Sequence, residues 1–391
     1  MATGTSPTGQ NAAPAGDASR LAWVDNVRTF MIVLVVNMHA CVTYSHVGSW
    51  FITLPPEPGL SIKIPFFFWQ GHLQSFFMGL LFFIAGGFAE RSIARKGRVH
   101  FLGDRVVRLG APTLFFMLVI WPLTVWGINH EDQVRSFSRF LEVYQHFVLS
   151  GGFISASGPL WFAFALLMFS VIFALLRREG TRESARPAPG GWRVLLFCAF
   201  LTVSTFLVRL AHPLETSVLN FQLSYFPQYV IGFWAGALST RHHWLARLAE
   251  SRLARHAGIL GLVGGPAALF TVLQLGGPPG KGAYPYGGGW HWQALGLAAW
   301  EQFSGPALAL GIMYLFTRRW NLQRPWTEWL SRHSFGVYVL HTPVLVILAR
   351  LGEPWHLSPA VGAVWLTASG LAVSYAVSGL ALKVPGFRRV L

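Results

Sequence analysis

Charged residues are scarce in this chain of 391 residues. Asp, Glu, Lys and Arg make up only 12% of it, about half the fraction usual for a soluble domain. Only two cysteines are present, Cys41 and Cys198, and both lie in apolar stretches, so no disulfide between loops is available. Cys41 could carry an acyl group, but its setting favours a buried, inert thiol.

Several common catalytic motifs are missing. The chain has no Gly-x-Ser-x-Gly sequence, and Gly-Pro-Pro-Gly-Lys281-Gly lacks the first Gly and the Ser or Thr of a phosphate-binding loop. The 14 histidines are scattered without metal-ligand spacing, and His242-His243 is too short to form a metal site. We therefore predict neither ATP hydrolysis nor a bound metal.

Apolar residues are abundant: they make up 53% of the chain, and the mean hydropathy is +0.46. Runs of about 18–25 apolar residues are typical of membrane-spanning helices. We predict an all-α, polytopic membrane bundle of about ten spans, near residues 22–45, 72–90, 107–128, 158–176, 193–210, 224–240, 257–275, 292–317, 334–350 and 359–382.

The distribution of positive charge predicts the orientation. With the N-terminus inside, 24 of the 30 Lys and Arg residues fall on inner segments, as the positive-inside rule requires. An even number of spans and two cytoplasmic termini follow. The net charge of +15 is thus spread over short inner loops, which favours anionic lipid and argues against nucleic acid as a partner.

The chain ends predict simple flanking segments. Residues 1–20 are rich in Ala, Gly, Pro, Ser and Thr, and no basic residue precedes Arg20, so they lack the start of a signal peptide. We predict a disordered cytosolic tail over 1–20, a membrane domain over 21–384 and a short basic cytosolic segment over 385–391.

The first span carries ionisable residues where lipid would disfavour them. Arg28 and His39 lie eleven positions apart and so share one helix face, which Asp25 joins at the inner end. The stripe of Asp25, Arg28, Met31, Val35 and His39 predicts the lining of an internal cavity. The alternative is an interfacial Asp25/Arg28 pair together with a packed histidine.

Other ionisable residues lie in later spans. Arg105 and Arg108, at the mouth of the third span, could clamp phosphates, or could snorkel as anchors. Glu301 and His341 lie about 13 Å deep, at a level similar to that of His39. These three groups predict a shared polar site, unless each has its own partner.

Two further features have structural explanations. Trp161 opens the fourth span, where an aromatic belt at the membrane interface explains it equally well. Gly232 and Gly236 form a small-xxx-small pair, which predicts close helix packing.

Taken in order, these motifs resemble the membrane-bound acyltransferase 3 family, and within it the glucan biosynthesis protein C type. The resemblance is carried by Trp23–Arg28 with His39, Phe82–Phe88, Phe101–Arg108 with Pro112, Leu160–Phe162, Tyr225–Gly232 and Ser334–His341. Ala85-Gly86 stands where many relatives have Ser-Gly.

The resemblance implies transfer of an acyl group, acetyl or succinyl, from cytosolic acyl-CoA to a hydroxyl of a glycan or other acceptor outside the membrane. It implies an inner-membrane location, acyl-CoA as a co-substrate, and no permanently bound cofactor. His39 would be the general base on the acceptor hydroxyl, and a covalent acyl-imidazole relay is the variant. Arg28 would hold the anion on the thioester side or steer His39, and Asp25 would neutralise the charge of Arg28. Arg105 and Arg108 would bind CoA phosphates.

The acceptor side is less defined. Glu301, His341 and Trp161 are candidate acceptor-binding residues, and the outer segments 46–71 and 129–157 are candidates for acceptor recognition. Two alternatives stay open: a secondary transporter that carries protons on His39, Glu301 and His341, and a glycan flippase.

Overall fold

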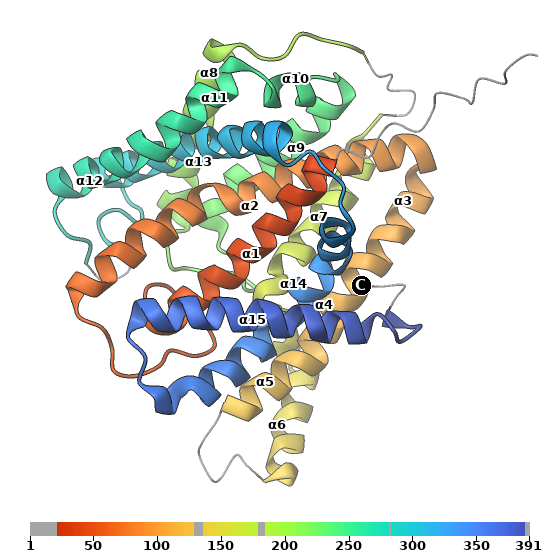
Figure 1. Ribbon diagram of the computed structural model, residues 1–391, viewed down its shortest axis with the longest axis vertical. Helices are drawn as coiled ribbons and strands as arrows, with labels where there is room; N and C mark the ends of the chain where they lie inside the picture. Colours follow the sequence, from red (N-terminus) through yellow and green to blue (C-terminus); the bar gives the residue numbers. More distant parts are fainter. Residues whose placement is uncertain (1–21, 129–135, 179–183, 281–282, 388–391) are drawn as a thin grey trace, which may run out of the picture.

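The computed structural model describes residues 22–128, 136–178, 184–280 and 283–387. The predicted tail 1–20 and the last residues of the basic C-terminal segment, 388–391, lie outside this described part. Within it the chain contains no strand, and one isolated β-bridge joins Val218 and Phe221. The predicted all-α, polytopic bundle is confirmed (Figure 1).

The longer helices are α1 (Ala22–Ser45), α2 (Leu60–Lys96), α6 (Phe137–Leu149), α7 (Trp161–Leu176), α8 (Gly191–Ala211), α9 (Phe226–Arg241), α12 (Gly265–Gly276), α13 (Trp292–Arg319), α14 (Pro325–Gly352) and α15 (Pro359–Ala381). Between them lie the shorter helices α3 (Arg98–Arg105), α4 (Ala111–Phe115), α5 (Trp121–Ile128), α10 (Leu245–Ala249) and α11 (Arg252–Ile259). Three π-helical turns, η1 (Val106–Gly110), η2 (Phe116–Ile120) and η6 (Leu260–Gly264), join short helices into longer segments.

Eight helical segments of the described residues are long and apolar enough to cross a bilayer: Ala22–Ser45, Leu60–Lys96, Arg98–Ile128, Gly158–Leu176, Gly191–Ala211, Arg252–Gly276, Pro325–Trp355 and Pro359–Ala381. The other two predicted spans, 224–240 and 292–317, are the helices α9 and α13. With 16 residues, α9 is shorter than the ~20 that a bilayer core requires. In α13 three of the buried residues are polar: Glu301, Gln302 and Ser304.

Several helical segments begin earlier than their predicted spans; the third, for example, begins at Arg98 instead of residue 107. α2 starts at Leu60 instead of residue 72, and α14 at Pro325 instead of 334. The predicted start of α2 at residue 72 excludes Gln70, a polar residue. In the structure Gln70 lies within the helix, because its side chain forms hydrogen bonds inside the bundle. Its amide accepts from Ser45 Oγ at 3.1 Å and donates to the Val47 carbonyl at 3.0 Å. A polar residue that finds such partners does not end a membrane helix.

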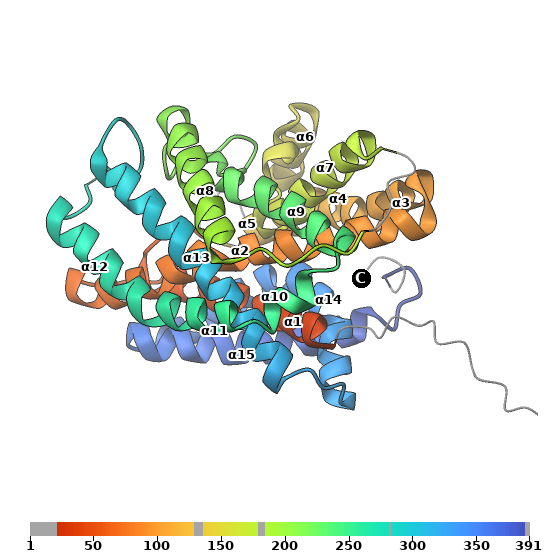
Figure 2. The same ribbon diagram turned by 90° about the horizontal axis from the view of Figure 1, so that it is seen from above.

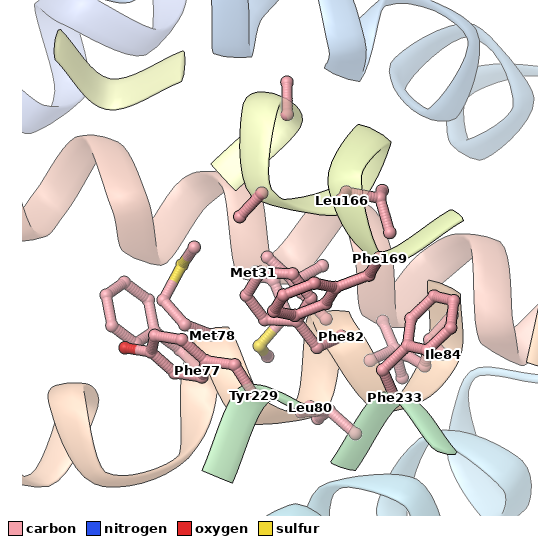
Figure 3. Packing of buried hydrophobic residues seen from close by; sticks show 14 of the residues in the cluster. Met31, Phe77, Met78, Leu80, Phe82, Ile84, Leu166, Phe169, Tyr229 and Phe233 are labelled. Carbon is pink, nitrogen blue, oxygen red and sulfur yellow. The ribbon is translucent and has the colours of Figure 1, made fainter. Parts of the chain in front are cut away.

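Aromatic and aliphatic side chains fill the centre of the bundle. Phe82 of α2 has the ring of Tyr229 from α9 at 5.0 Å and that of Phe169 from α7 at 5.1 Å (Figure 3). Met31 of α1 joins this cluster and is fully buried. These contacts hold α2, α7 and α9 at fixed separations, and the polar residues of α1 are positioned against them.

Small residues bring α2 and α9 into backbone contact. A Cβ added to Gly236 would lie 1.8 Å from the Phe83 carbonyl oxygen, and one added to Gly86 would lie 1.9 Å from that of Phe233. The prediction that Gly232 and Gly236 serve close helix packing is confirmed, since Gly232 faces the carbonyl of Gly79. A side chain at Gly236 would force the two helices apart.

A buried carboxylate joins three helices near their C-terminal ends. Glu90 of α2 is 1% exposed and accepts hydrogen bonds from Arg177, at the end of α7, and Arg241, the last residue of α9. Both Arg Nη2 to Glu90 distances are 3.0 Å. Two arginines thus compensate one buried carboxylate.

The first helix lies inside the bundle. α1 contacts α2, α13, α14 and α15, and both ribbon views place it between α2 and α15 (Figures 1 and 2). Ionisable residues on α1 are therefore enclosed by protein on several sides. The polar residues of α1 therefore lie in the interior of a predominantly apolar bundle.

Candidate active site

Asp25 and Arg28 form an ion pair in the first turns of α1. Arg28 Nη1 lies 3.5 Å from Asp25 Oδ1, and the guanidinium also sits over the Phe88 ring of α2, 5.6 Å from its centroid. The Asp25 side chain is 11% exposed and that of Arg28 is 41% exposed. The pair is therefore not sealed in the core.

The exposed part of this pair faces a cavity of about 580 Å³. Four of the predicted site residues line it: Asp25, Arg28, Arg105 and Arg108. The predicted lining by Met31 is wrong, because Met31 turns into the apolar core and Ile32 lines the cavity in its place. The predicted α1 stripe thus lines the cavity at Asp25, Arg28 and Val35. The prediction is also wrong for His39, which follows Val35 by one helical turn and does not line this cavity.

The cavity is strongly basic. Besides the predicted arginines it contains three residues that sequence reasoning treated only as inner-loop charge: Arg91, Arg95 and Lys96. Asp104 joins Asp25 as the second acidic residue, and it pairs with Lys96. Six basic side chains and two acidic ones give the cavity lining a net positive charge, which suits an anionic ligand.

A π-helical turn shapes one wall of the cavity. Arg105 ends α3 and its guanidinium lies 5.2 Å from the Phe101 ring centroid, while Arg108 is in the π-helical turn η1. Such a turn changes the angular spacing of side chains within a helix, and π-bulges are frequent at functional sites. Both arginines line the same cavity as Arg28 of α1.

At its deep end, within the bundle, the cavity comes close to two histidines. Val35 and Tyr338 line it there, alongside Phe162 from α7. His39 follows Val35 by one helical turn on α1, and His341 follows Tyr338 by one turn on α14. The histidines therefore lie just beyond the end of the basic cavity.

His39 and His341 come together as predicted. Their ring centroids are 5.4 Å apart, and the ring planes differ by 17°. His341 is fully buried, and its Nδ1 lies 2.7 Å from the Tyr338 carbonyl oxygen. The expectation that at least two of the three deep ionisable groups share a site is confirmed for this pair.

Trp50 belongs to the same site, and sequence reasoning missed it. It lies in the loop after α1, and its ring stacks on His39 with centroids 3.6 Å apart and planes 15° apart. The loop is fixed by a bond from the Leu54 N–H to the Thr43 carbonyl, at 2.9 Å, and by His46, whose ring lies 2.8 Å from the Leu54 carbonyl. With 17 tryptophans in the chain, no sequence signal singled this one out.

Glu301 has a partner of its own. Arg209 Nη2 of α8 lies 2.5 Å from Glu301 Oε2, and both side chains are buried. Arg209 also sits over the Tyr225 ring at 5.3 Å. Glu301 therefore does not join the two histidines. It has its own partner, which is the alternative that the sequence left open for these deep residues.

Trp161, the first residue of α7, packs in the aromatic cluster. Its ring lies 5.5 Å from that of Tyr229 and 6.4 Å from that of Phe82. Its neighbour Phe162, not Trp161 itself, lines the cavity. An acceptor-binding role for Trp161 stays a prediction.

A family model described as an acyltransferase domain, Acyl_transf_3, matches residues 21–381. The chain belongs to the acyltransferase 3 family. Comparison with curated proteins and with solved structures finds no match. The family match covers both histidines and every basic residue of the cavity, so this membrane acyltransferase carries the whole candidate site within its family domain.

Within this acyltransferase, the site has two chemically distinct parts. The cavity supplies basic groups at one end of α1, and the imidazoles of His39 and His341 lie towards the other end. Arg28 and His39 are separated by about 16 Å along the helix axis, from their spacing of eleven residues. Arg28 thus lines the cavity and is too far from His39 to orient its ring directly.

Proposed function

We propose that this protein is an inner-membrane O-acyltransferase that moves an acetyl or succinyl group from cytosolic acyl-CoA to a hydroxyl of a glycan or similar acceptor outside the membrane. The observation that carries the proposal is the basic cavity whose inner end lies one helical turn from the paired histidines His39 and His341. The reaction requires groups that bind phosphate and a base, and in this proposal the cavity arginines and His39 would supply them.

The donor would bind through its phosphates in the cavity. Guanidinium groups suit phosphate because they donate in a planar fork. Arg28, Arg105 and Arg108, which line the same cavity, would hold the CoA phosphates, and Asp25 would offset the charge of Arg28. Acyl-CoA is a co-substrate in this proposal, and no resident cofactor is needed.

The transfer itself would use His39 as general base. Neutral His39 takes the proton of the acceptor hydroxyl as its oxygen attacks the thioester carbonyl, so a C–O bond forms and the C–S bond breaks. The CoA thiolate leaves and takes the proton back, which yields an O-acyl ester and free CoA. Each turnover thus returns the base to its starting state.

The acceptor would approach from the end of α1 at which Trp50 lies. The segment 46–59 forms the loop at this end, and the first turns of α2 follow it. Within the predicted outer segment 46–71, these residues would recognise the acceptor. Of the second predicted segment, 129–157, residues 129–135 lie outside the described part of the structure.

Radiolabelled transfer from acetyl-CoA and from succinyl-CoA to membrane-derived glycans tests the proposal. We expect label in the glycan with wild-type membranes and none with His39→Ala at matched expression. His100→Ala, on the inner helix α3 and outside the cavity lining, is the control and should transfer normally. Full activity of His39→Ala would overturn the proposed base, and proton-coupled uptake without transfer would support a transporter instead.

A further inference from the structure

The rings of Trp50 and His341 lie around the His39 ring, one over its face and the other beside its edge. The Trp50 ring lies 3.6 Å from His39, His341 lies 5.4 Å from His39, and Trp50 lies 6.1 Å from His341. All three planes are within 17° of parallel. The line from the His39 centroid to Trp50 and the line from the His39 centroid to His341 therefore form an angle close to 90°.

A separation of 3.6 Å between nearly parallel rings leaves room only for face-to-face contact, so Trp50 covers one face of His39. His341, at about a right angle to that direction, lies beside the edge of the His39 ring and not above it. The two imidazoles are thus nearly coplanar, edge to edge. Ring nitrogens donate and accept in the plane of the ring, so this arrangement suits an N–H···N hydrogen bond.

The hydrogen bond at Nδ1 fixes the tautomer of His341. A carbonyl oxygen can only accept, so the 2.7 Å contact with Tyr338 requires Nδ1 to carry the hydrogen. In the neutral ring, Nε2 then holds an in-plane lone pair. Nε2 of His341 is buried and makes no hydrogen bond in the structure.

A buried acceptor without a partner costs about 1–3 kcal/mol, so its presence beside another imidazole calls for an explanation. We infer that His341 is the positioning partner of His39: its Nε2 accepts the N–H of His39 and stabilises the imidazolium that forms during transfer. This inference rests on the proposed function. Catalytic hydrogen bonds commonly close only when the reacting groups are in place, which fits an acceptor that waits unbonded.

The proton balance is complete with these groups. The acceptor O–H proton moves to one nitrogen of His39 as the C–O bond forms, while the other nitrogen keeps its hydrogen and donates it to His341 Nε2. When the C–S bond breaks, the CoA thiolate removes the first proton. His341 neither gains nor loses a proton over the cycle.

Two substitutions at residue 341 separate this role from a packing role. In His341→Gln the side-chain amide reaches the position of Nε2 and can accept there. In His341→Asn the amide reaches only the position of Nδ1, so it can keep the bond to the Tyr338 carbonyl but has no acceptor at Nε2. A structural role predicts that Asn is the better replacement, and the positioning role predicts that Gln is.

We expect His341→Asn to lower kcat about 100-fold or more, with an unchanged KM for acyl-CoA, and His341→Gln to recover most of the lost kcat. Wild-type kcat in His341→Asn, or equal losses in both variants with a lowered melting temperature, would overturn the inference. If His39→Ala is inactive while His341→Asn is normal, the proposed function stands and the partnership falls. If the wild type transfers no acyl group, both fall together.

Discussion

Arg209 and Glu301 form a buried ion pair between α8 and α13, with 2.5 Å between Nη2 and Oε2. The Arg209 side chain has no exposed surface, and its Nε and Nη1 atoms have no hydrogen-bond partner. A single carboxylate therefore compensates this guanidinium. The pair joins two helices that are far apart in the sequence.

Removal of one partner of this pair should destabilise the fold. We expect Glu301→Gln to lower the free energy of unfolding by about 3–5 kcal/mol, because it leaves the Arg209 charge buried. Thermal unfolding in detergent measures the loss. Glu142→Gln, in the exposed pair with Arg139, is the matched control and should cost at most about 1 kcal/mol. A stable Glu301→Gln protein that has lost acyl transfer would instead support the acceptor-binding role.

The backbone contact between α2 and α9 predicts a strong dependence on side-chain size. Gly236→Ala should lower stability by about 1–3 kcal/mol, because the new methyl group meets the rigid carbonyl of Phe83. Gly264→Ala is the control: a Cβ there meets nothing within 4 Å. Melting temperatures of the two variants decide the point, and equal values would show that the close approach is not maintained.

The basic cavity predicts a specific kinetic effect. Arg105→Ala and Arg108→Ala should each raise the KM for acyl-CoA about tenfold or more, as expected for a lost charge-assisted hydrogen bond, with little change in kcat. Arg319→Ala also removes an inner-side charge but does not line this cavity, so its KM should be normal. A uniform effect of all three substitutions would point to general membrane charge and away from a donor site.

Trp50 should keep water from the reacting groups as well as hold the His39 ring. We expect Trp50→Ala to lower transfer to the acceptor and to raise hydrolysis of acyl-CoA by water, whereas Trp50→Phe should keep most of the stacking contact. Release of free CoA without acceptor measures the hydrolysis. Trp355→Ala is the control, because Trp355 packs on Trp365 instead. Unchanged hydrolysis in Trp50→Ala would argue against this shielding.

Much of the architecture was predictable, because the thickness of the bilayer determines how many consecutive apolar residues a membrane-spanning helix needs. α1 and α13 begin at their predicted residues, and α1 also ends where expected. The early starts of α2 and α14 were not predictable from hydropathy. Gln70 continues α2 through hydrogen bonds to a serine and a loop carbonyl, and the sequence does not specify such partners.

The candidate site was predictable where a helical repeat controls it. Arg28 and Asp25 share a face of α1, and that face lines the cavity. The prediction chose Met31, three residues after Arg28, whereas the cavity is lined by Ile32, four residues after it. Both positions lie close to the face of Arg28, so the helical repeat alone does not decide between them. Depth alone predicted that at least two of His39, Glu301 and His341 meet, but not which two. That choice, the Arg209–Glu301 pair and the Trp50 contact depend on how distant segments meet in space.

Tyr338 and Val35 line the basic cavity, and the Tyr338 hydroxyl donates to the Pro159 carbonyl. Neither His39 nor His341 lines this cavity, and Trp50 covers one face of the His39 ring. Under the proposed function, the acyl end of the donor has to pass Val35 and Tyr338 before it reaches His39. The space between these two side chains would then limit the size of the acyl group that the enzyme can transfer.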